Sequence, residues 1–362
     1  MDTLFSLPVL SLFLIPTTAS YTTSLNFIFF YMTWSTLVFS HSPLRVELFG
    51  TVAVRLLFYV LPSLLFFLFD ILTPSAAMMI KVNGEGGLPS GRRRGKIRLK
   101  DIKIAGWGLA NVILSIVVQA IIEKIRISAF GARSSLKVSI KLPMPWEMTK
   151  DLLRGLLVRE VMILALNNEK KIMENQLTFS FARLLQGISY AIHRFVLHSK
   201  DNRLRIVTEQ HQLWYHSLRT PFPLTAHYDH PLVYLLANFI PTYMPGMLFR
   251  FHMLTYLLYM SVVSVEETFA FSGYTVMPTS FFLSGMARRT EIHLFSGAKG
   301  NFGPWGILDW ICGTNVTDDD DVLDEPGVQR ATMDDKVKKA VERSTQKKFY
   351  ERHRLRRGRR DD

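Results

Sequence analysis

Long stretches without any charged residue constrain this chain more than any other feature of its sequence. Residues 3–44 contain no Asp, Glu, Lys or Arg. Within them, residues 21–40 are mostly apolar, and a helix of about 20 residues crosses a hydrocarbon core about 30 Å thick. The shorter apolar run of residues 4–15 resembles a signal peptide, but Asp2 stands where a basic residue is expected. We therefore interpret the first 40 residues as an uncleaved membrane anchor, either one helix or a hairpin.

Two further apolar stretches predict two more spans. Residues 52–72 carry Arg55 and Asp70 near their ends, where both charges can reach the membrane interfaces. Pro62 lies inside this stretch, and membrane helices tolerate proline. Residues 104–122 carry no charge at all. Together these stretches predict an all-α fold, a polytopic membrane helical bundle.

A fourth apolar region, residues 231–265, is interrupted by two prolines and by Arg250 and His252. It predicts a helical hairpin that dips into the bilayer. The number of crossings stays open. If the basic loop 81–103 and the basic tail are both cytosolic, the chain must cross an even number of times between them. Either one segment is re-entrant, or residues 151–191 contain another crossing.

The net charge of +13 is concentrated at the end of the chain. Residues 336–360 hold twelve Lys or Arg against Glu342 and Glu351, which is +10 of that total. A solvated tail of this kind is not a duplex-binding face, so we expect no nucleic-acid partner. The single cysteine, Cys312, excludes an intramolecular disulfide and a thiolate zinc cluster.

Histidines are concentrated in one short window. Of the ten in the chain, six fall between residues 193 and 230: His193, His198, His211, His216, His227 and His230. Imidazole is the commonest metal-binding side chain, and it suits Fe, Cu, Zn and Ni alike. The window predicts a polyhistidine metal centre in a cytosolic, histidine-rich helical cap on the membrane bundle.

The spacing of these histidines leaves two arrangements open. His227 and His230 are three apart and share a helical face or a turn. The other two pairs are five apart, which puts them about 140° apart on a regular helix. Either a π-bulge brings each pair to a common face, or each pair serves two different ions. Six or seven histidines suit a dinuclear centre, with Asp229, Tyr215 and Glu267 as candidate partners of the imidazole N–H groups.

Residues 150–314 resemble the fatty acid hydroxylase/sterol desaturase superfamily of integral membrane proteins. That superfamily has two histidine boxes, an E-x-x-x-x-H-x-G-Y element, and a final histidine box before N-Y/F-G and W-D-x-x-x-G-T. The matching residues are His193 and His198, His211 and His216, His230-Pro231, Glu266 or Glu267 with Gly273-Tyr274, His293, Asn301-Phe302-Gly303, Asp309 and Gly313-Thr314.

The chain also departs from the family pattern. The first box has one extra residue. Tyr215 stands where the second box usually has a histidine, and Phe271 stands where a histidine often precedes x-G-Y. Leu294 and Phe295 lie near the expected histidine pair of the third box.

The resemblance implies a cytosol-facing, non-haem di-iron centre that uses O2 and electrons from NAD(P)H through cytochrome b5 or a reductase. Such enzymes hydroxylate or desaturate a fatty acyl chain or a sterol taken from the endoplasmic reticulum membrane, and we favour an acyl chain. Seven histidines are the expected iron ligands and catalytic residues: His193, His198, His211, His216, His227, His230 and His293. The hairpin is expected to form the channel that admits the lipid.

Four regions follow from these observations. They are membrane anchor helices (1–80), a basic cytosolic loop with the third span and a connector (81–150), a hydroxylase-like catalytic domain (151–314) and a charged disordered tail (315–362). Two other functions stay open, a catalytically inactive lipid-binding relative and a metal transporter. Transporters place their polar residues inside spans, whereas most of these histidines lie between spans.

Overall fold

The computed structural model describes residues 21–89, 97–160, 188–218, 221–274, 283–295 and 300–316, and every regular element in them is a helix. The predicted all-α fold is confirmed. The predictions for residues 4–15, for the basic run 92–94 and for the tail beyond residue 316 concern residues outside these ranges. The possible crossing within residues 151–191 falls mostly on residues 161–187, which also lie outside these ranges.

Within the described ranges, two helices are long and apolar enough to cross a membrane. The first, Pro43–Leu72, is continuous and has 30 residues. It joins α4 (Pro43–Arg55), the π-helical turn η1 (Leu56–Val60) and α5 (Leu61–Leu72). The second is α7 (Leu99–Ser128), also of 30 residues. Both extend beyond the spans predicted from hydropathy, because polar and charged residues in their end turns continue the helix after the apolar run stops.

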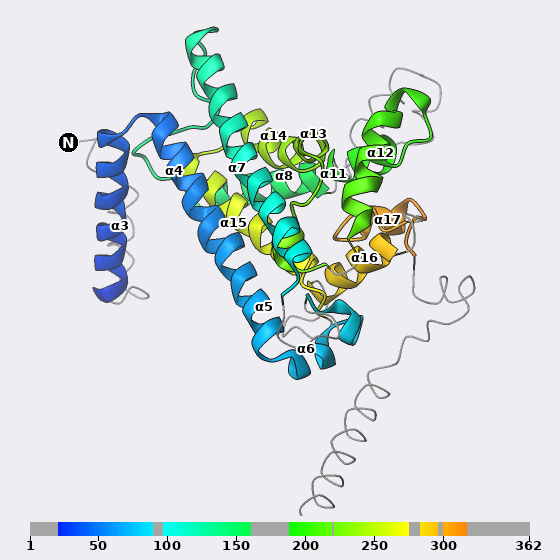
Figure 1. The fold of residues 1–362 in the computed structure, drawn as a ribbon. Helices are drawn as coiled ribbons and strands as arrows, with labels where there is room; N and C mark the ends of the chain where they lie inside the picture. Colours follow the sequence, from blue (N-terminus) through cyan, green and yellow to red (C-terminus); the bar gives the residue numbers. More distant parts are fainter. Residues whose placement is uncertain are drawn as a thin grey trace, which may run out of the picture.

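The first described helix, α3 (Tyr21–Ser40), lies at the edge of the bundle and is joined to it through the start of α4 (Figure 1). Its described apolar part, Leu25–Ser40, is shorter than the two long helices. Two short elements follow α5 and bring the chain back toward α7. They are α6 (Pro74–Ile80) and the 3₁₀ turn η2 (Gly84–Gly87).

The second half of the chain is built from shorter helices. They are α8 (Pro145–Glu160), α11 (Ile188–Ile192), η4 (His193–Leu197), η5 (Asn202–Leu204), α12 (Arg205–Trp214), η6 (Tyr215–Ser217), η7 (Pro223–Thr225), α13 (Pro231–Tyr234), η8 (Leu235–Phe239), α14 (Ile240–Leu248), α15 (Met253–Ala270), α16 (Leu283–Phe295) and α17 (Ile307–Ile311). The predicted hairpin is present as α13 to α14 followed by α15. Arg250 turns the chain between its legs at φ 48°, and the His252 side chain caps α15 by accepting from Leu254 N–H.

Helix α15 is the centre of the packing, because α4, α8 and α16 all lie against it (Figure 1). Its buried face includes Tyr256, Tyr259, Met260 and Val263. The same helix carries two buried carboxylates near its C-terminal end. Glu266 pairs with Arg159 of α8, and Glu267 pairs with Arg55 of α4. The helices of the two halves of the chain are therefore joined by apolar packing and by buried ion pairs.

Helix α7 holds the end of the histidine window in place. The Asn111 side chain donates to the carbonyl oxygens of His227 and Asp229, both at 2.9 Å. One turn away, Gly108 packs so closely that an added Cβ would lie 2.6 Å from the Leu224 carbonyl oxygen. Glycine is needed at this point because the backbone of residues 223–229 fills the space a side chain would take.

We expect Gly108→Val to push α7 away from residues 223–229 and to lower the free energy of unfolding by about 1–3 kcal/mol, the usual cost of overpacking. The matched control is Gly106→Val, because a Cβ at Gly106 meets nothing within 4 Å. Thermal unfolding of both variants in detergent measures the difference. Equal melting temperatures would show that the close approach does not contribute to stability.

Candidate metal centre

His193 and His198 lie at the two ends of the π-helical turn η4, where His198 N–H donates to the His193 carbonyl at 3.2 Å. An i to i+5 bond adds one residue to the turn, so side chains five apart come to the same face. Their rings stack at 5.1 Å with an interplanar angle of 29°. Of the two arrangements that the spacing left open, the π-turn is the one that this pair adopts.

The second pair comes together differently. His211 is in the last turn of α12, and His216 is in the 3₁₀ turn η6 that follows it. The rings lie 5.2 Å apart and nearly perpendicular, at 86°. At this pair the chain changes from α-helix to 3₁₀ turn between the two residues. This change, and not a π-bulge, brings the two rings together.

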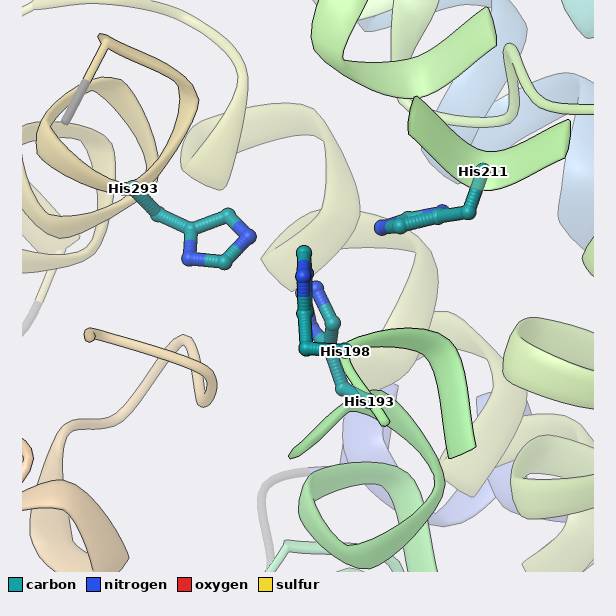
Figure 2. A group of neighbouring side chains, drawn as sticks. All are labelled: His193, His198, His211 and His293. Carbon is teal, nitrogen blue, oxygen red and sulfur yellow. The ribbon is translucent and has the colours of Figure 1, made fainter. Parts of the chain in front are cut away.

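Four imidazoles converge on one point (Figure 2). They belong to His193, His198, His211 and His293, and their candidate ligand nitrogens all lie within 4.8 Å of one another. His293 reaches the point from α16, on the side opposite α12. A fifth ring borders the group, since His216 Nε2 lies 3.4 Å from His198 Nε2.

Main-chain carbonyls orient two of these rings. His193 Nδ1–H donates to the Phe302 carbonyl at 2.9 Å, and His293 Nδ1–H donates to the Gly300 carbonyl at 2.7 Å. A carbonyl oxygen only accepts, so the proton of each ring is on Nδ1 and the lone pair is on Nε2. Both Nε2 atoms are buried and have no hydrogen-bond partner. A metal ligand fixed by a second hydrogen bond has this arrangement.

The third ring is oriented by a carboxyl group, as predicted for Asp229. His211 Nδ1 lies 2.8 Å from Asp229 Oδ2, and its buried Nε2 has no partner. The other oxygen of Asp229 accepts from the backbone N–H of His230 at 2.7 Å. Burial raises the pKa of Asp229. A cation on Nε2 of His211 would favour the proton on Nδ1 and the carboxylate as its acceptor.

Burial keeps the clustered imidazoles neutral. It lowers the pKa of His198 and of His211 to about 3 and that of His216 to about 4. The pKa values of His193 and His293 fall well below the ordinary value, first through burial and then through the neighbouring rings. Neutral imidazole is the form that binds a metal, so the site is ready for a cation at neutral pH.

The loop of residues 300–303 supplies the two carbonyl groups that orient His193 and His293. The sequence predicted this loop only as part of a family motif. Asp309 accepts from the N–H groups of Phe302 and Gly303, both at 2.9 Å, and from the Thr314 hydroxyl at 2.8 Å. These bonds fix residues 300–303 under the histidines. The spacing of Asn-Phe-Gly, Asp and Gly-Thr in the sequence indicated that this loop belongs to the site. It did not reveal that the loop orients the histidines through its backbone carbonyl groups.

Two of the seven predicted ligands lie outside the cluster. His227 packs edge-on against Tyr59 at 4.5 Å, and its Nε2 lies 3.3 Å from Glu267 Oε2. His230 packs against Trp214 at 5.7 Å. The structure brings together five of the seven histidines. That any of them binds metal stays a prediction.

The other two predicted orienting groups have different surroundings. The Tyr215 ring stacks on His211 at 4.8 Å and 16°. Glu267 is held by Arg55 and faces His227. Tyr215 therefore contacts the cluster through its ring, and Glu267 belongs to the buried ion pairs beside it.

A small cavity of about 110 Å³ lies beside the clustered rings. His193, His211 and His293 line one part of it, and Arg159 and Glu266 line another. The Arg159 guanidinium donates to both Glu266 oxygens at 2.9 Å. The cavity therefore joins the imidazoles to one of the buried ion pairs of α15.

A larger and almost entirely apolar groove of about 580 Å³ begins at the same carboxylate. Its lining residues come from η1, α15, α16 and the loop before α17: Phe58, Leu258, Ser261, Val262, Val265, Glu266, Met286 and Trp305. Glu266 lines both spaces, and Pro304 of the cavity precedes Trp305 of the groove. Of the hairpin that was expected to form the channel, α15 lines this groove, and η1 and α16 line it as well.

We expect Asp229→Asn to weaken metal binding by about 10–100-fold, the usual cost of removing a partner of a ligating histidine. The amide keeps an acceptor of similar shape but loses the charge that stabilises a metal-bound imidazole. Titration of the metal-free protein with Co²⁺ measures the affinity. Asp201→Asn is the control, because Asp201 is an exposed cap of η5. An unchanged affinity in Asp229→Asn would show that His211 is not a ligand.

Residues 179–314 match the fatty acid hydroxylase family. The matched range contains all five clustered histidines, the Asp229 partner and the loop of residues 300–314. No solved structure matches the chain significantly. The family resemblance inferred from the histidine motifs is confirmed, and the family is one of lipid-modifying oxidoreductases. Residues 179–314, which carry the histidine cluster, are therefore similar to the fatty acid hydroxylase family.

Proposed function

We propose that the protein is a membrane-bound, metal-dependent oxygenase that hydroxylates or desaturates a lipid chain. The observation that carries the proposal is the set of three buried Nε2 atoms, on His193, His211 and His293, that have no partner and face one point. A buried polar atom left unpaired costs free energy unless a ligand satisfies it. Three of them around one point are what a metal site requires.

The donor set fits iron. Imidazole suits several transition metals, so the reaction class decides between them. The C–H bond of a lipid chain offers no acid–base handle, and bound iron supplies the oxidising power from O2 and electrons. The resemblance implies a non-haem di-iron centre, and whether two irons bind depends on how many separate donor sets the chain presents. The protein itself holds the imidazoles, excludes bulk water and positions the lipid.

The apolar groove supports a lipid as the substrate. Its volume lies within the range of about 300–1,000 Å³ that is usual for sites of small apolar ligands. Phe58 lines it from the helix Pro43–Leu72, which also carries exposed apolar side chains such as Leu57 and Leu65. A chain in the bilayer can enter such a groove without crossing water. We favour a fatty acyl chain, and a sterol is the alternative within the same family.

The electron donor and the location are part of the same proposal. We propose that NAD(P)H supplies electrons through cytochrome b5 or a reductase, and that the enzyme resides in the endoplasmic reticulum membrane with its histidine site and C-terminal tail in the cytosol. O2 consumption by membranes containing the protein, with and without NADPH, tests the first part. Protease accessibility of a C-terminal tag in sealed vesicles tests the second.

Lipid profiling tests the reaction itself. Cells producing the parent protein are compared with cells producing His193→Ala and with cells producing Val265→Trp, which fills the inner end of the groove. We expect acyl lipids that carry one more oxygen or two fewer hydrogens in the parent only. Leu68→Trp is the control for the groove variant, because Leu68 is exposed on a long apolar helix. Identical lipid profiles for the parent and His193→Ala would contradict the proposal.

A second candidate function, a lipid-binding relative without activity, is favoured by Tyr215, Phe271 and Leu294 at positions where the family has histidines. Its outcome in the same experiment is distinct. The protein would bind metal and lipid, and the lipid profile of the parent would equal that of His193→Ala.

A further inference from the structure

A dinuclear centre needs two sets of donor atoms, and the described part of the chain presents one. Among the residues described, one group of three or more His, Cys, Asp or Glu has converging donor atoms. His216 borders that group through His198 and does not start another. Five imidazoles around one point can saturate a single ion. Two irons would have to share these donors.

The residues that replace family histidines pack on one another beside the cluster. The Tyr215 and Phe271 rings meet edge to face at 6.1 Å. Phe271 and Leu294 are buried in the same apolar cluster, and Tyr215 packs against that cluster. The Tyr215 ring also lies 6.2 Å from the His293 ring. Three side chains at or near positions where the family pattern has histidines therefore pack together beside the cluster.

The two carboxylates of α15 beside the cluster are paired with buried arginines. Both oxygens of Glu266 accept from Arg159, and Glu267 pairs with Arg55. His227 lies between the rings of Tyr59 and Tyr234, outside the cluster. Each carboxylate already balances a buried arginine, while Glu267 Oε1 has no partner, so a metal ion that took over either carboxylate would leave a buried arginine unpaired. The free energy cost of leaving such a charge unpaired is large.

We propose that this centre binds one metal ion per chain, held by His193, His211 and His293 with His198 or His216 completing the site, and that Tyr215, Phe271 and Leu294 close the position of a second ion. The proposal rests on the metal-binding part of the proposed function and not on the reaction. It distinguishes this protein from the dinuclear pattern that its family resemblance implies.

Metal stoichiometry tests the proposal directly. The full chain is purified in detergent, stripped with a chelator and titrated anaerobically with Co²⁺, while bound metal is counted per chain by elemental analysis. We expect one ion in the parent and in His230→Ala, and none in His193→Ala/His293→Ala. Two ions in the parent, or loss of the ion in His230→Ala, would overturn the proposal. No ion in the parent would overturn both this proposal and the proposed function, whereas one ion without lipid turnover would reject the reaction alone.

Replacing Tyr215, Phe271 and Leu294 by histidine tests whether these three residues exclude a second ion. The triple variant Tyr215→His/Phe271→His/Leu294→His is expected to bind a second Co²⁺, while Tyr215→Phe/Phe271→Leu stays at one. Retention of the first ion shows that the triple variant has folded. A folded triple variant that still binds one ion would contradict the role given to these three residues. If the triple variant loses the first ion as well, the parent stoichiometry decides the number of ions.

Discussion

Replacing His293 by alanine is expected to weaken metal binding by more than about 100-fold and to abolish lipid turnover. Removing an orienting partner of a ligand costs about 10–100-fold, so removing the ligand itself costs more. His293 is buried, its Nδ1 is held by the Gly300 carbonyl, and its Nε2 faces the other imidazoles. Because α16 brings this imidazole alone to the cluster, the substitution removes the donor on that side of the site.

Co²⁺ titration of the metal-free protein gives the affinity, and lipid profiling gives the turnover. His41→Ala is the control, because His41 is exposed and lies between α3 and α4. The variant and the control have the same number of histidines. A difference in their metal affinity therefore depends on where the lost histidine lies in the structure. Equal affinity in the two variants would show that α16 does not contribute to the centre.

Replacing Glu267 by alanine is expected to lower the free energy of unfolding by about 3–5 kcal/mol, the cost of leaving a buried cation unpaired. Arg55 belongs to the continuous apolar helix Pro43–Leu72, and both side chains of the pair are almost fully buried. Its remaining partner is the Ser264 hydroxyl at 3.1 Å, which is neutral. One hydroxyl does not compensate for a guanidinium that is out of contact with water.

Thermal and denaturant-induced unfolding in detergent measures this loss. The matched control is Glu209→Ala, which breaks the exposed pair of Arg205 and Glu209 at 2.6 Å. Exposed pairs of this kind contribute about 0–1 kcal/mol. The double variant Arg55→Met/Glu267→Leu removes both charges and is expected to recover most of the stability. A Glu267→Ala protein as stable as Glu209→Ala would mean that water reaches Arg55.

Hydropathy and residue type predicted the class of fold and the kind of chemistry. Residues 52–72 and 104–122 are apolar over lengths that suit a membrane, and both lie within the 30-residue helices of the structure. The hairpin from residue 231 was equally readable, because its apolar legs are separated by a charged turn. These predictions succeeded because each depends on neighbours along the chain. The ends of these two helices were not predicted, because their terminal turns contain polar and charged residues that a hydropathy criterion leaves out.

The concentration of histidines in the window 193–230 by itself indicated a metal site, and the spacing of five suggested the π-turn that the first pair adopts. Only the tertiary structure separated the clustered rings from His227 and His230. It brought His293 from α16 to the other side of the same point and showed that Gly300 and Phe302 act through their carbonyls. It also placed Tyr215 against Phe271. Convergence of donors depends on the packing of separate helices, which no local spacing encodes, so the sequence determined which ligands are available and the fold decided which of them meet.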